Sequence, residues 1–282
     1  MLRVAVPNKG SLSEAAIDIL TEAGYRQRRS TKDLALTDPD NEVEFYYLRP
    51  KDIAVYVGLG TLDVGISGRD LVLDSKAEAN VIVELGFGRS TFRFAGPPGS
   101  AKTVKDLDGK RIATSYAGVL TDYLEEHGVE AKVVRLDGAV ESAVQLGVAD
   151  VIADVVETGT TLRQAGLEVF GEPILKSEAV LIARNGAAAT PKGLEQLVRR
   201  LQGVLVARNY VMMDYDIRAE AVEKANALTP GLESPTVSPL HREGWVAVRA
   251  MVPRADAQRI MDQLWEVGAR AILTTDIHAC RI

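Results

Sequence analysis

The stretch Gly147-Val148-Ala149-Asp150-Val151-Ile152-Ala153 has the same pattern as Gly60-Thr61-Leu62-Asp63-Val64-Gly65-Ile66. In both, a glycine that suits the end of a helix leads through an aspartate into an apolar run that suits a buried strand. Residues 3–25 and 111–134 are also alike, since each predicts a strand, a turn or loop with glycine, and a helix. The turn in the second of these segments is expected at Ala117-Gly118. The sequence therefore predicts two similar α/β halves.

Near-continuous apolar strands that alternate with helices are typical of parallel sheets covered on both faces. We therefore expect two lobes with a cleft between them, the layout of periplasmic-binding-protein-like folds. The first lobe would comprise residues 1–90 and 184–210, and the second residues 91–183. Leucines and a valine at helical spacing in 194–205 predict a helix that packs on the first lobe.

From Val211 onward the order of expected elements changes. The pattern predicts a strand at 211–217, a helix at 219–227, strands at 232–238 and 244–252, a helix at 254–267 and a strand at 270–277. This βαββαβ order is that of the ferredoxin-like module. Residues 211–282 are therefore expected to form a separate domain.

Composition and charge exclude several classes of protein. A chain of 282 residues exceeds the size of one undivided core. The net charge is -6 and the basic residues are scattered, which argues against binding to nucleic acid. No apolar run reaches the length of about 18 residues that a membrane span needs, and Met1 leads directly into strand-like sequence. We therefore expect a cytoplasmic protein that binds no membrane.

The residue inventory also limits the metals that the chain can bind. Cys280 is the single cysteine and the histidines lie far apart, so a Cys/His metal centre is not expected. Mg²⁺ remains the metal option, because it is carried mainly by substrate phosphates with one or two carboxylates and leaves almost no motif.

The segment 151–162 carries the clearest chemical pattern, an apolar strand with carboxylates followed by a loop of small residues and a helix. The start of a helix exposes unpaired N–H groups, and Gly159 lets the backbone approach a phosphate closely. The alternative is an ordinary helix start with threonine as the N-cap. The local pattern alone leaves both interpretations open.

A second glycine-rich segment, 96–103, differs from a P-loop at one position, Ala101. Two prolines remove two of the N–H donors that a P-loop needs, and the flanking elements are not of the right kind. We therefore reject a P-loop here.

Ten positions between 141 and 162 resemble the signature of the ATP phosphoribosyltransferases, without an insertion. They are Glu141, Gly147, Ala149, Ile152, Asp154, Val155, Thr158, Gly159, Thr161 and Leu162. These enzymes open histidine biosynthesis by joining ATP to phosphoribosyl pyrophosphate, and the chain is most similar to the long form found in actinobacteria. The resemblance implies that Asp154 lies near the ribose hydroxyls and that a loop holds the 5′-phosphate. The implied donor-binding residues are Asp154, Glu157, Thr158, Gly159, Thr160, Thr161 and Leu162.

Segments 48–53 and 65–71 resemble the nucleotide side of that family. The resemblance implies nucleotide-side roles for Lys9, Arg49, Lys51, Asp70 and Glu141, and catalytic roles for Lys9, Arg49, Lys51 and Asp154. The alternatives are that the exposed cations only solvate a loop and that Glu141 only stabilises the start of a helix. The family has Pro-Lys-Gly-Arg after its first strand, whereas this chain has Pro-Asn-Lys-Gly-Ser at 7–11, so the role of Lys9 stays open.

The family's reaction is attack of adenine N1 on C1′ of the donor, with Mg²⁺ as cofactor and pyrophosphate as leaving group. A competing interpretation is a bilobal binding protein without catalysis, which predicts export. The expected absence of a signal peptide and the enzyme signature both argue against it.

The C-terminal domain resembles the regulatory region that short members of the family lack. The resemblance implies histidine as a feedback inhibitor bound there, AMP as a further ligand, and a homodimer that can assemble into a hexamer. The implied histidine-binding residues are Asp216, Leu232, Ser234, Thr236 and Ala271. Asp216 alternatively caps the helix expected near Ala219.

Overall fold

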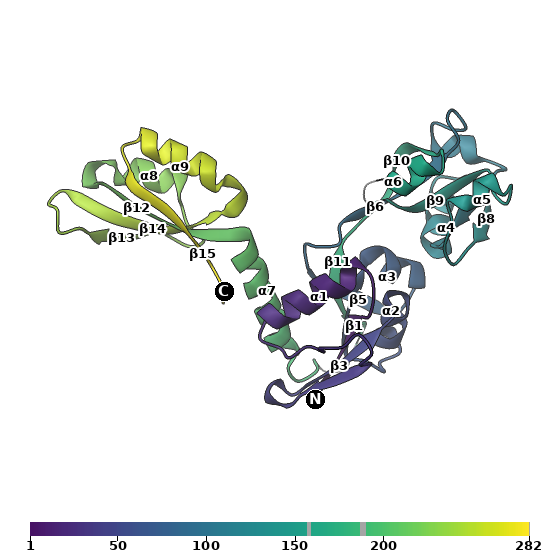
Figure 1. The fold of residues 1–282 in the computed structure, drawn as a ribbon, viewed down its shortest axis with the longest axis horizontal. Coiled ribbons are helices and arrows are strands. Elements are labelled where there is room, and N and C mark those ends of the chain that lie inside the picture. The colour runs from purple at the N-terminus through teal and green to yellow at the C-terminus, as the bar shows by residue number, and fades with distance from the viewer. Residues whose placement is uncertain (157–158, 187–189, 282) are drawn as a thin grey trace. The chain divides into compact units, whose positions relative to one another are not determined.

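The structure is a computed structural model that describes residues 1–156, 159–186 and 190–281 (Figure 1). Contacts divide the chain into two units, one of residues 1–21 and 25–194 and the other of residues 22–24 and 195–282. The first unit contains two α/β lobes, each with its own sheet, and the second contains a third sheet. The predicted fold class, a two-lobed α/β core plus a ferredoxin-like domain, is confirmed.

The first lobe is built on a six-stranded sheet in the order β2-β3-β1-β4-β11-β5. Helix α2 packs its buried Ile53, Ala54 and Val57 against this sheet. The strands are β1 (Leu2–Pro7), β2 (Ala35–Asp38), β3 (Val43–Leu48), β4 (Val64–Gly68), β5 (Ala79–Glu84) and β11 (Ala179–Arg184). The helices are α1 (Ser11–Glu22), α2 (Pro50–Gly58) and α3 (Arg69–Ser75), with a short 3-10 helix at Pro39–Asn41.

The second lobe has a five-stranded sheet in the order β10-β6-β9-β7-β8, with a buried core on each face. Its strands are β6 (Ser90–Gly96), β7 (Arg111–Thr114), β8 (Lys132–Arg135), β9 (Val151–Val156) and β10 (Glu168–Ser177). Its helices are α4 (Ala117–Glu126), α5 (Ser142–Gln145) and α6 (Thr160–Gln164), with a 3-10 helix at Val104–Leu107. The chain passes between the lobes twice, from β5 to β6 and from β10 to β11.

Two expectations about these lobes were wrong. The sheets are mixed rather than parallel, because β11 pairs antiparallel with β4 and β5, and β6 pairs antiparallel with β9 and β10. Strands β6 and β11 are the first strands that the chain forms after each passage between the lobes. Each of them runs antiparallel to its neighbours in the sheet that it joins. The turn expected at Ala117-Gly118 is instead the first turn of α4.

The predicted repeat between the lobes is confirmed by a shared ion-pair arrangement. In the first lobe, Arg3 donates its backbone N to Asp63 Oδ2 at 2.8 Å and pairs its guanidinium with Oδ1 at 3.2 Å. In the second, Arg111 donates its backbone N to Asp150 Oδ2 at 2.8 Å and pairs with Oδ1 at 2.8 Å. Each arginine lies at the start of a strand, Arg3 as the second residue of β1 and Arg111 as the first of β7. Each aspartate directly precedes the adjacent parallel strand, so the same clamp joins equivalent strands of both lobes.

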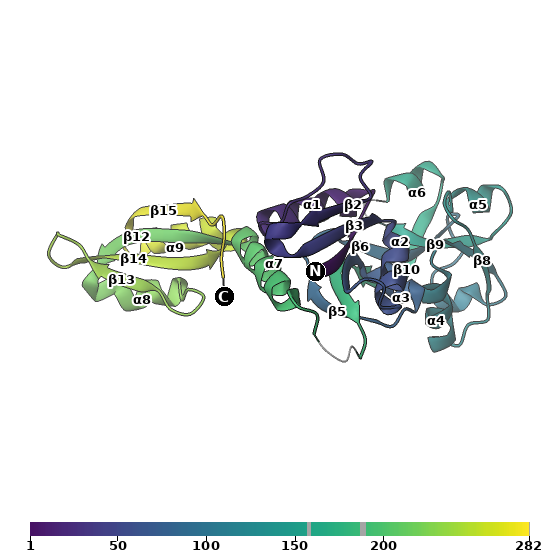
Figure 2. The ribbon, with the colours of Figure 1, turned by 90° about the horizontal axis from the view of Figure 1, so that it is seen from below.

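The second unit contains a four-stranded antiparallel sheet in the order β13-β14-β12-β15, and Figure 2 shows these strands side by side. The strands are β12 (Tyr210–Arg218), β13 (Thr236–Pro239), β14 (Trp245–Pro253) and β15 (Arg270–Asp276). The helices are α7 (Leu194–Asn209), α8 (Val222–Leu228) and α9 (Ala257–Glu266), with 3-10 turns at Ala219–Ala221 and Arg254–Asp256. Helices α8 and α9 cover one face of the sheet through Ala225, Ile260 and Leu264 (Figure 1).

Two details of this unit differ from expectation, and the packing of α7 on the first lobe stays a prediction. The strand expected from residue 232 begins at Thr236, because Gly231 adopts a positive φ of 74° and Pro235 precedes the strand. Both expected helices begin as 3-10 turns. Helix α7, expected to pack on the first lobe, groups from Glu195 onward with the C-terminal unit. None of the described helices has the length and apolar character needed to cross a membrane.

Candidate functional site

Asp154 lies in the last part of β9, and its surroundings disfavour its charge. Its pKa is raised from its ordinary value, first because burial disfavours the charged form and also because of the negative charge of Glu141. The Lys51 ammonium and a hydrogen bond from Val155 N to Asp154 Oδ1, at 2.8 Å, act in the opposite direction. The structure therefore brings together groups from β9, from the start of α5 and from α2 of the other lobe.

Glu141 does not act as a side-chain cap of the helix that follows it. It occupies the N-cap position of α5, yet its carboxylate makes no capping hydrogen bond there. Its charge acts instead on Asp154. The alternative, stabilisation of the helix start by the charge of Glu141, needs no capping hydrogen bond and stays open.

The small-residue loop leads into α6 at Gly159, which has a positive φ of 68°. Gly159 is the N-cap and no side chain caps the helix, so the alternative of a threonine N-cap is not supported by the described residues. Thr160 and Thr161 are exposed in the first turn, and the buried Leu162 anchors the helix in the core. Glu157 and Thr158 lie outside the described residues. An uncapped helix start after a glycine suits an anion.

A pocket of about 540 Å³ borders this loop on the side of β6 and β10. Its lining includes Gly159 together with two cations, Arg93 and Arg163. Arg93 donates from Nη2 to the Gly171 carbonyl at 2.5 Å, whereas its buried Nε has no hydrogen-bond partner among the described residues. Positive charge is thus available beside the loop.

Two of the nucleotide-side residues, Lys51 and Asp70, lie near the junction where α3 of the first lobe contacts α4 of the second. Lys51 Nζ donates to the Ser115 carbonyl at 3.3 Å and lies 5.6 Å from the centroid of the Tyr116 ring. Asp70 is buried, and its Oδ1 accepts from Ser177 Oγ at 2.8 Å. Burial raises the pKa of the Tyr116 hydroxyl, and the charges of Asp70 and Asp154 raise it further.

Tyr116 and Ser177 were not identified from the sequence. Tyr116 lies between β7 and α4, the position that Lys9 occupies between β1 and α1, so the internal repeat was the signal that would have found it. Ser177 ends β10 and contacts Asp70 across 107 positions of sequence, which no local pattern indicates.

Lys9 and Arg49 are exposed in loops and make no hydrogen bond or ion pair with other side chains of the described chain. Lys9 follows β1, and Arg49 is the N-cap of α2, two residues before Lys51. Arg49 is therefore close to Lys51 in the chain. The structure leaves the role of Lys9 open.

The glycine-rich segment 96–103 cannot cradle a phosphate in this conformation. Asp106 Oδ2 accepts from Lys102 N and from Thr103 N, each at 2.9 Å, within a capping box. A carboxylate thus occupies the amides that a P-loop would offer to phosphate, in agreement with its rejection.

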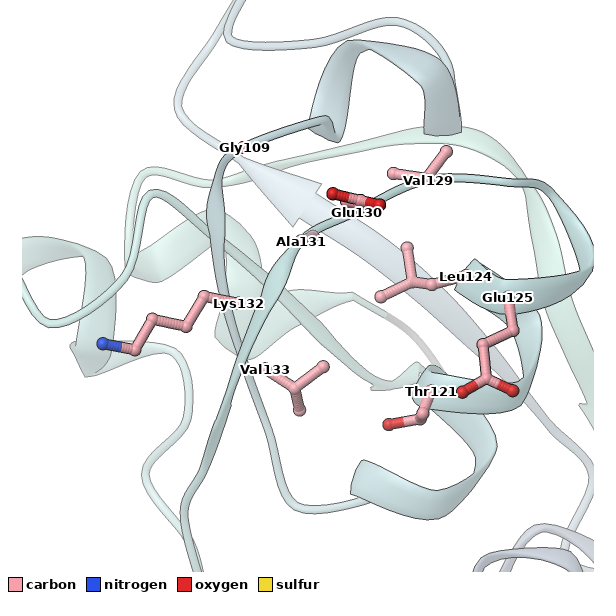
Figure 3. Close-up of a pocket in the computed structure, with 9 residues that line it drawn as sticks. All are labelled: Gly109, Thr121, Leu124, Glu125, Val129, Glu130, Ala131, Lys132 and Val133. Atoms are coloured by element: carbon pink, nitrogen blue, oxygen red, sulfur yellow. The ribbon is translucent and has the colours of Figure 1, made fainter.

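Another pocket, of about 490 Å³, lies between α4 and β8 (Figure 3). Glu125 and Glu130 contribute carboxylates, and Lys132 extends away from Thr121 and Glu125 in Figure 3. None of the predicted site residues lines this pocket. Its charge does not suit a phosphate, so we do not assign the site to it.

The residues expected to bind an effector lie in and beside the C-terminal sheet. Asp216 alternates along β12 with the buried Tyr215 and Ile217, so it faces away from the helices. It does not cap the following 3-10 helix, whose N-cap is Arg218 without a side-chain bond, so the capping alternative was wrong. Asp214 pairs with Arg249 Nε at 2.6 Å, whereas Asp216 has no such partner among the described residues.

The remaining effector residues are all exposed. Leu232 and Ser234 lie in the loop before β13, and Thr236 begins that strand. Ala271 has a positive φ of 51°, at a bulge where β15 shifts register against β12. Alanine rarely adopts this conformation, which is strained for any residue with a Cβ atom.

The described residues contain no group of three or more His, Cys, Asp or Glu side chains placed to hold a metal ion. Asp154 and Glu141 carry two carboxylates with oxygen atoms of the kind that Mg²⁺ binds. The negative charge of Glu141 contributes to the raised pKa of Asp154. A pair of carboxylates suits a Mg²⁺ ion that takes its other ligands from phosphate and water.

Comparison with known proteins assigns both parts of the chain. Residues 49–203 match the family described as HisG, ATP phosphoribosyltransferase, and residues 207–279 match the HisG C-terminal domain. The ATP phosphoribosyltransferase of Arthrobacter sp. (strain FB24) is 69% identical over 286 residues, covering 100% of both chains. That of Streptomyces coelicolor is 68% identical over 285 residues, again covering 100% of both chains.

A solved structure agrees with this assignment. The ATP phosphoribosyl transferase (HisG:HisZ) complex from Thermotoga maritima contains a chain with 27% identity and a TM-score of 0.63, covering 72% of this chain and 97% of that one. Two family matches and full-length relatives thus agree with the signature between 141 and 162. The chain is an enzyme that belongs to the ATP phosphoribosyltransferase family.

Proposed function

We propose that this chain condenses ATP with phosphoribosyl pyrophosphate to form N1-(5-phosphoribosyl)-ATP and pyrophosphate, the first step of L-histidine biosynthesis. The observation that carries the proposal is the arrangement at the end of β9, where Asp154 and the uncapped start of α6 lie together. Identity near 69% along the full chain to relatives named for this activity supports it. We expect the enzyme to work in the cytoplasm.

The start of α6 holds the 5′-phosphate in this proposal. Backbone N–H groups after Gly159 and the Thr161 hydroxyl donate to phosphate oxygens, and the positive φ of Gly159 brings the backbone close. Glu157, Thr158 and Thr160 are further donor-binding residues in this proposal, and the buried Leu162 anchors α6 in the core. Fixing the phosphate orients C1′ for in-line attack.

Asp154 and the lysine and arginine side chains serve the reacting end of the donor. Asp154 accepts hydrogen bonds from the ribose hydroxyls. Lys51, whose charge already acts on Asp154, and the neighbouring Arg49 offset the charge that develops on pyrophosphate, with Lys9 as a further cation. Asp70 and Tyr116 lie on the side where the adenine enters. The N1 lone pair attacks without a general base.

Mg²⁺ is the cofactor in this proposal, and it supplies charge neutralisation at the pyrophosphate oxygens when bound. Asp154 and Glu141 are the protein carboxylates in position to contribute oxygens, with most ligands coming from substrate phosphates and water.

Histidine inhibits the enzyme from the C-terminal domain in this proposal. The Asp216 carboxylate, which lacks an intramolecular partner among the described residues, accepts the histidine ammonium or imidazolium. Ser234 and Thr236 donate to its carboxylate, and Leu232 and Ala271 are further effector-binding residues in this proposal. We further propose AMP as a ligand and a homo-oligomer of dimers and hexamers.

The reaction is tested by mixing the purified chain with ATP, phosphoribosyl pyrophosphate and Mg²⁺, and by measuring pyrophosphate release with each component omitted in turn. The proposal requires release only when all are present, with phosphoribosyl-ATP detected in equal amount by mass spectrometry. Release from the donor alone would indicate hydrolysis, and binding of either substrate without product would contradict the proposed reaction.

A further inference from the structure

Helix α4 begins without a cap from its own sequence. Tyr116 is the N-cap residue, and it makes no side-chain hydrogen bond to the helix. The first amides of a helix have no partner within the helix and are normally satisfied by the N-cap side chain. A tyrosine ring cannot reach them, so the partner must come from elsewhere.

Asp74 of α3, in the other lobe, supplies that partner. Its Oδ1 accepts from Gly118 N at 2.8 Å and from Val119 N at 3.3 Å. These are the second and third residues of α4, whose amides an N-cap side chain ordinarily bonds. The carboxylate also lies at the positive end of the helix dipole, which favours its charge.

The sequence of α4 accommodates this contact at one position. A Cβ atom on residue 118 would lie 2.5 Å from the Asp74 carbonyl oxygen and 3.1 Å from its Oδ1, so only glycine permits the approach. The backbone carbonyl cannot move aside as a flexible side chain would. A second link between the same helices, from Lys76 Nζ to Asp122 Oδ1 at 2.7 Å, is half exposed on both sides.

The cap determines where the corner between β7 and α4 lies. This corner carries Tyr116, whose hydroxyl is close to Asp70, and Ser115, whose carbonyl accepts from Lys51. The hydrogen bonds that Asp74 Oδ1 accepts come from backbone N–H groups of α4. The charge of Asp74 also contributes to the raised pKa of the Tyr116 hydroxyl. The Asp74→Asn variant, which removes this charge and keeps the cap, separates that electrostatic effect from the position of the corner.

We propose that Asp74 is a positioning residue, an N-cap supplied from one lobe to a helix of the other, which holds Tyr116 against Asp70 in the arrangement that catalysis requires. The inference rests on the proposed function, since the reaction is its readout. It assigns a role in catalysis to a side chain that touches neither substrate.

The test combines four variants with two measurements on the full-length protein. Asp74→Ala removes the cap, Gly118→Ala blocks it by its Cβ, and Asp74→Asn keeps an oxygen that can cap. Asp122→Ala is the matched control, since it removes the neighbouring ion pair and leaves the cap. Steady-state kinetics with both substrates are measured at a temperature where circular dichroism shows each variant folded.

Hydrogen exchange of the peptide spanning 116–121 is the second measurement, and it needs no activity. We expect Asp74→Ala and Gly118→Ala to exchange this segment about fivefold faster or more and to lose at least about fivefold in kcat/KM, the order expected for loss of a cap. Asp74→Asn and Asp122→Ala are expected to stay within about twofold of wild type in both respects.

Unchanged exchange in Asp74→Ala would show that the cap does not form and would overturn the proposal. Faster exchange with unchanged kinetics would reduce Asp74 to a structural residue and would also overturn it. Failure of the proposed function is seen separately, as absence of product from the wild-type chain.

Discussion

The surroundings of Asp154 disfavour its charged form. Burial and the charge of Glu141 raise the pKa of its carboxyl. A raised pKa means that the protonated form stabilises the fold below the ordinary pKa, and that this contribution is lost as pH rises through the raised value. Ionisation of Asp154 therefore costs stability, a property that is frequent among residues of functional sites.

Replacement of Asp154 by Asn tests this interpretation. Asp154→Asn keeps the shape and removes the charge, so we expect turnover to fall by about tenfold or more while the melting temperature at pH 7 stays equal or rises. Kinetics and differential scanning calorimetry on the same sample measure both. Loss of activity together with stability would indicate a structural carboxylate instead.

Asp150→Asn is the matched control for that experiment. The Arg111 guanidinium and backbone N–H lower the pKa of the Asp150 carboxyl to about 2, so this aspartate stabilises the fold in its charged form. We expect the control to lose stability and to keep its turnover below its melting temperature.

Thr161 provides the second residue-scale prediction. Thr161→Val keeps the shape and removes a hydroxyl that the proposal assigns to the 5′-phosphate. A hydrogen bond to a charged partner contributes about 1.5 to 3 kcal/mol, so affinity for phosphoribosyl pyrophosphate should fall about tenfold or more, with ATP affinity unchanged. Calorimetric titration measures both, with Thr121→Val on α4 as control. Equal donor affinity in wild type and variant would remove Thr161 from the site.

From the sequence, candidate site residues could be predicted together where they lie in one continuous segment. Asp154, Gly159 and Leu162 could be predicted because a strand, a loop and a helix start follow one another there. The pairing of Asp70 with Ser177 could not, since the two are 107 positions apart and meet only when β10 has crossed between the lobes.

The arginine–aspartate clamp, repeated in both lobes, makes a prediction at the scale of elements. The pKa of the Asp150 carboxyl is lowered to about 2 in the folded protein. The charged carboxylate therefore stabilises the fold above the ordinary aspartate pKa of about 3.9, and this stabilisation is lost as pH falls towards 2. The pair is substantially exposed, so the contribution is at most about 1 kcal/mol.

Urea unfolding at pH 6 and at pH 3 measures this contribution. We expect the stability difference between wild type and Asp150→Asn to be larger at pH 6 than at pH 3, with Asp108→Asn as a control for an exposed aspartate. An equal difference at both pH values would mean that the charge of Asp150 does not stabilise the fold.

Elements were predicted well where periodicity is strong and less well where backbone conformation decides. Strand β7 and helix α7 follow their patterns closely. Strand direction is not encoded in an apolar run, which is why the antiparallel pairs of β11 were missed. Gly231 and Pro235 explain the late start of β13, since a left-handed glycine and a proline both interrupt a strand.

At the scale of the whole molecule, the C-terminal domain is expected to control the catalytic unit without taking part in the chemistry. Asp216→Ala should keep its turnover and require about tenfold more histidine or more for half-inhibition, because it removes the partner of a charged ligand group. Initial rates across a histidine series measure this, with Asp262→Ala on the opposite, helix-covered side as control. Unchanged inhibition with intact catalysis would place the effector site elsewhere.

The order of elements predicted this third sheet from the sequence, because strands β12 to β15 are contiguous in the chain. The amphipathic pattern of α7 predicts which of its faces is buried, but not which part of the chain covers that face.

A crystal structure of the enzyme with phosphoribosyl pyrophosphate and Mg²⁺ tests the central claim most directly. The account predicts that the 5′-phosphate lies at the backbone N–H groups after Gly159, within hydrogen-bond distance of Thr161, and that the ribose hydroxyls contact Asp154. Density for the donor at the pocket between α4 and β8, or anywhere away from the end of β9, would contradict it.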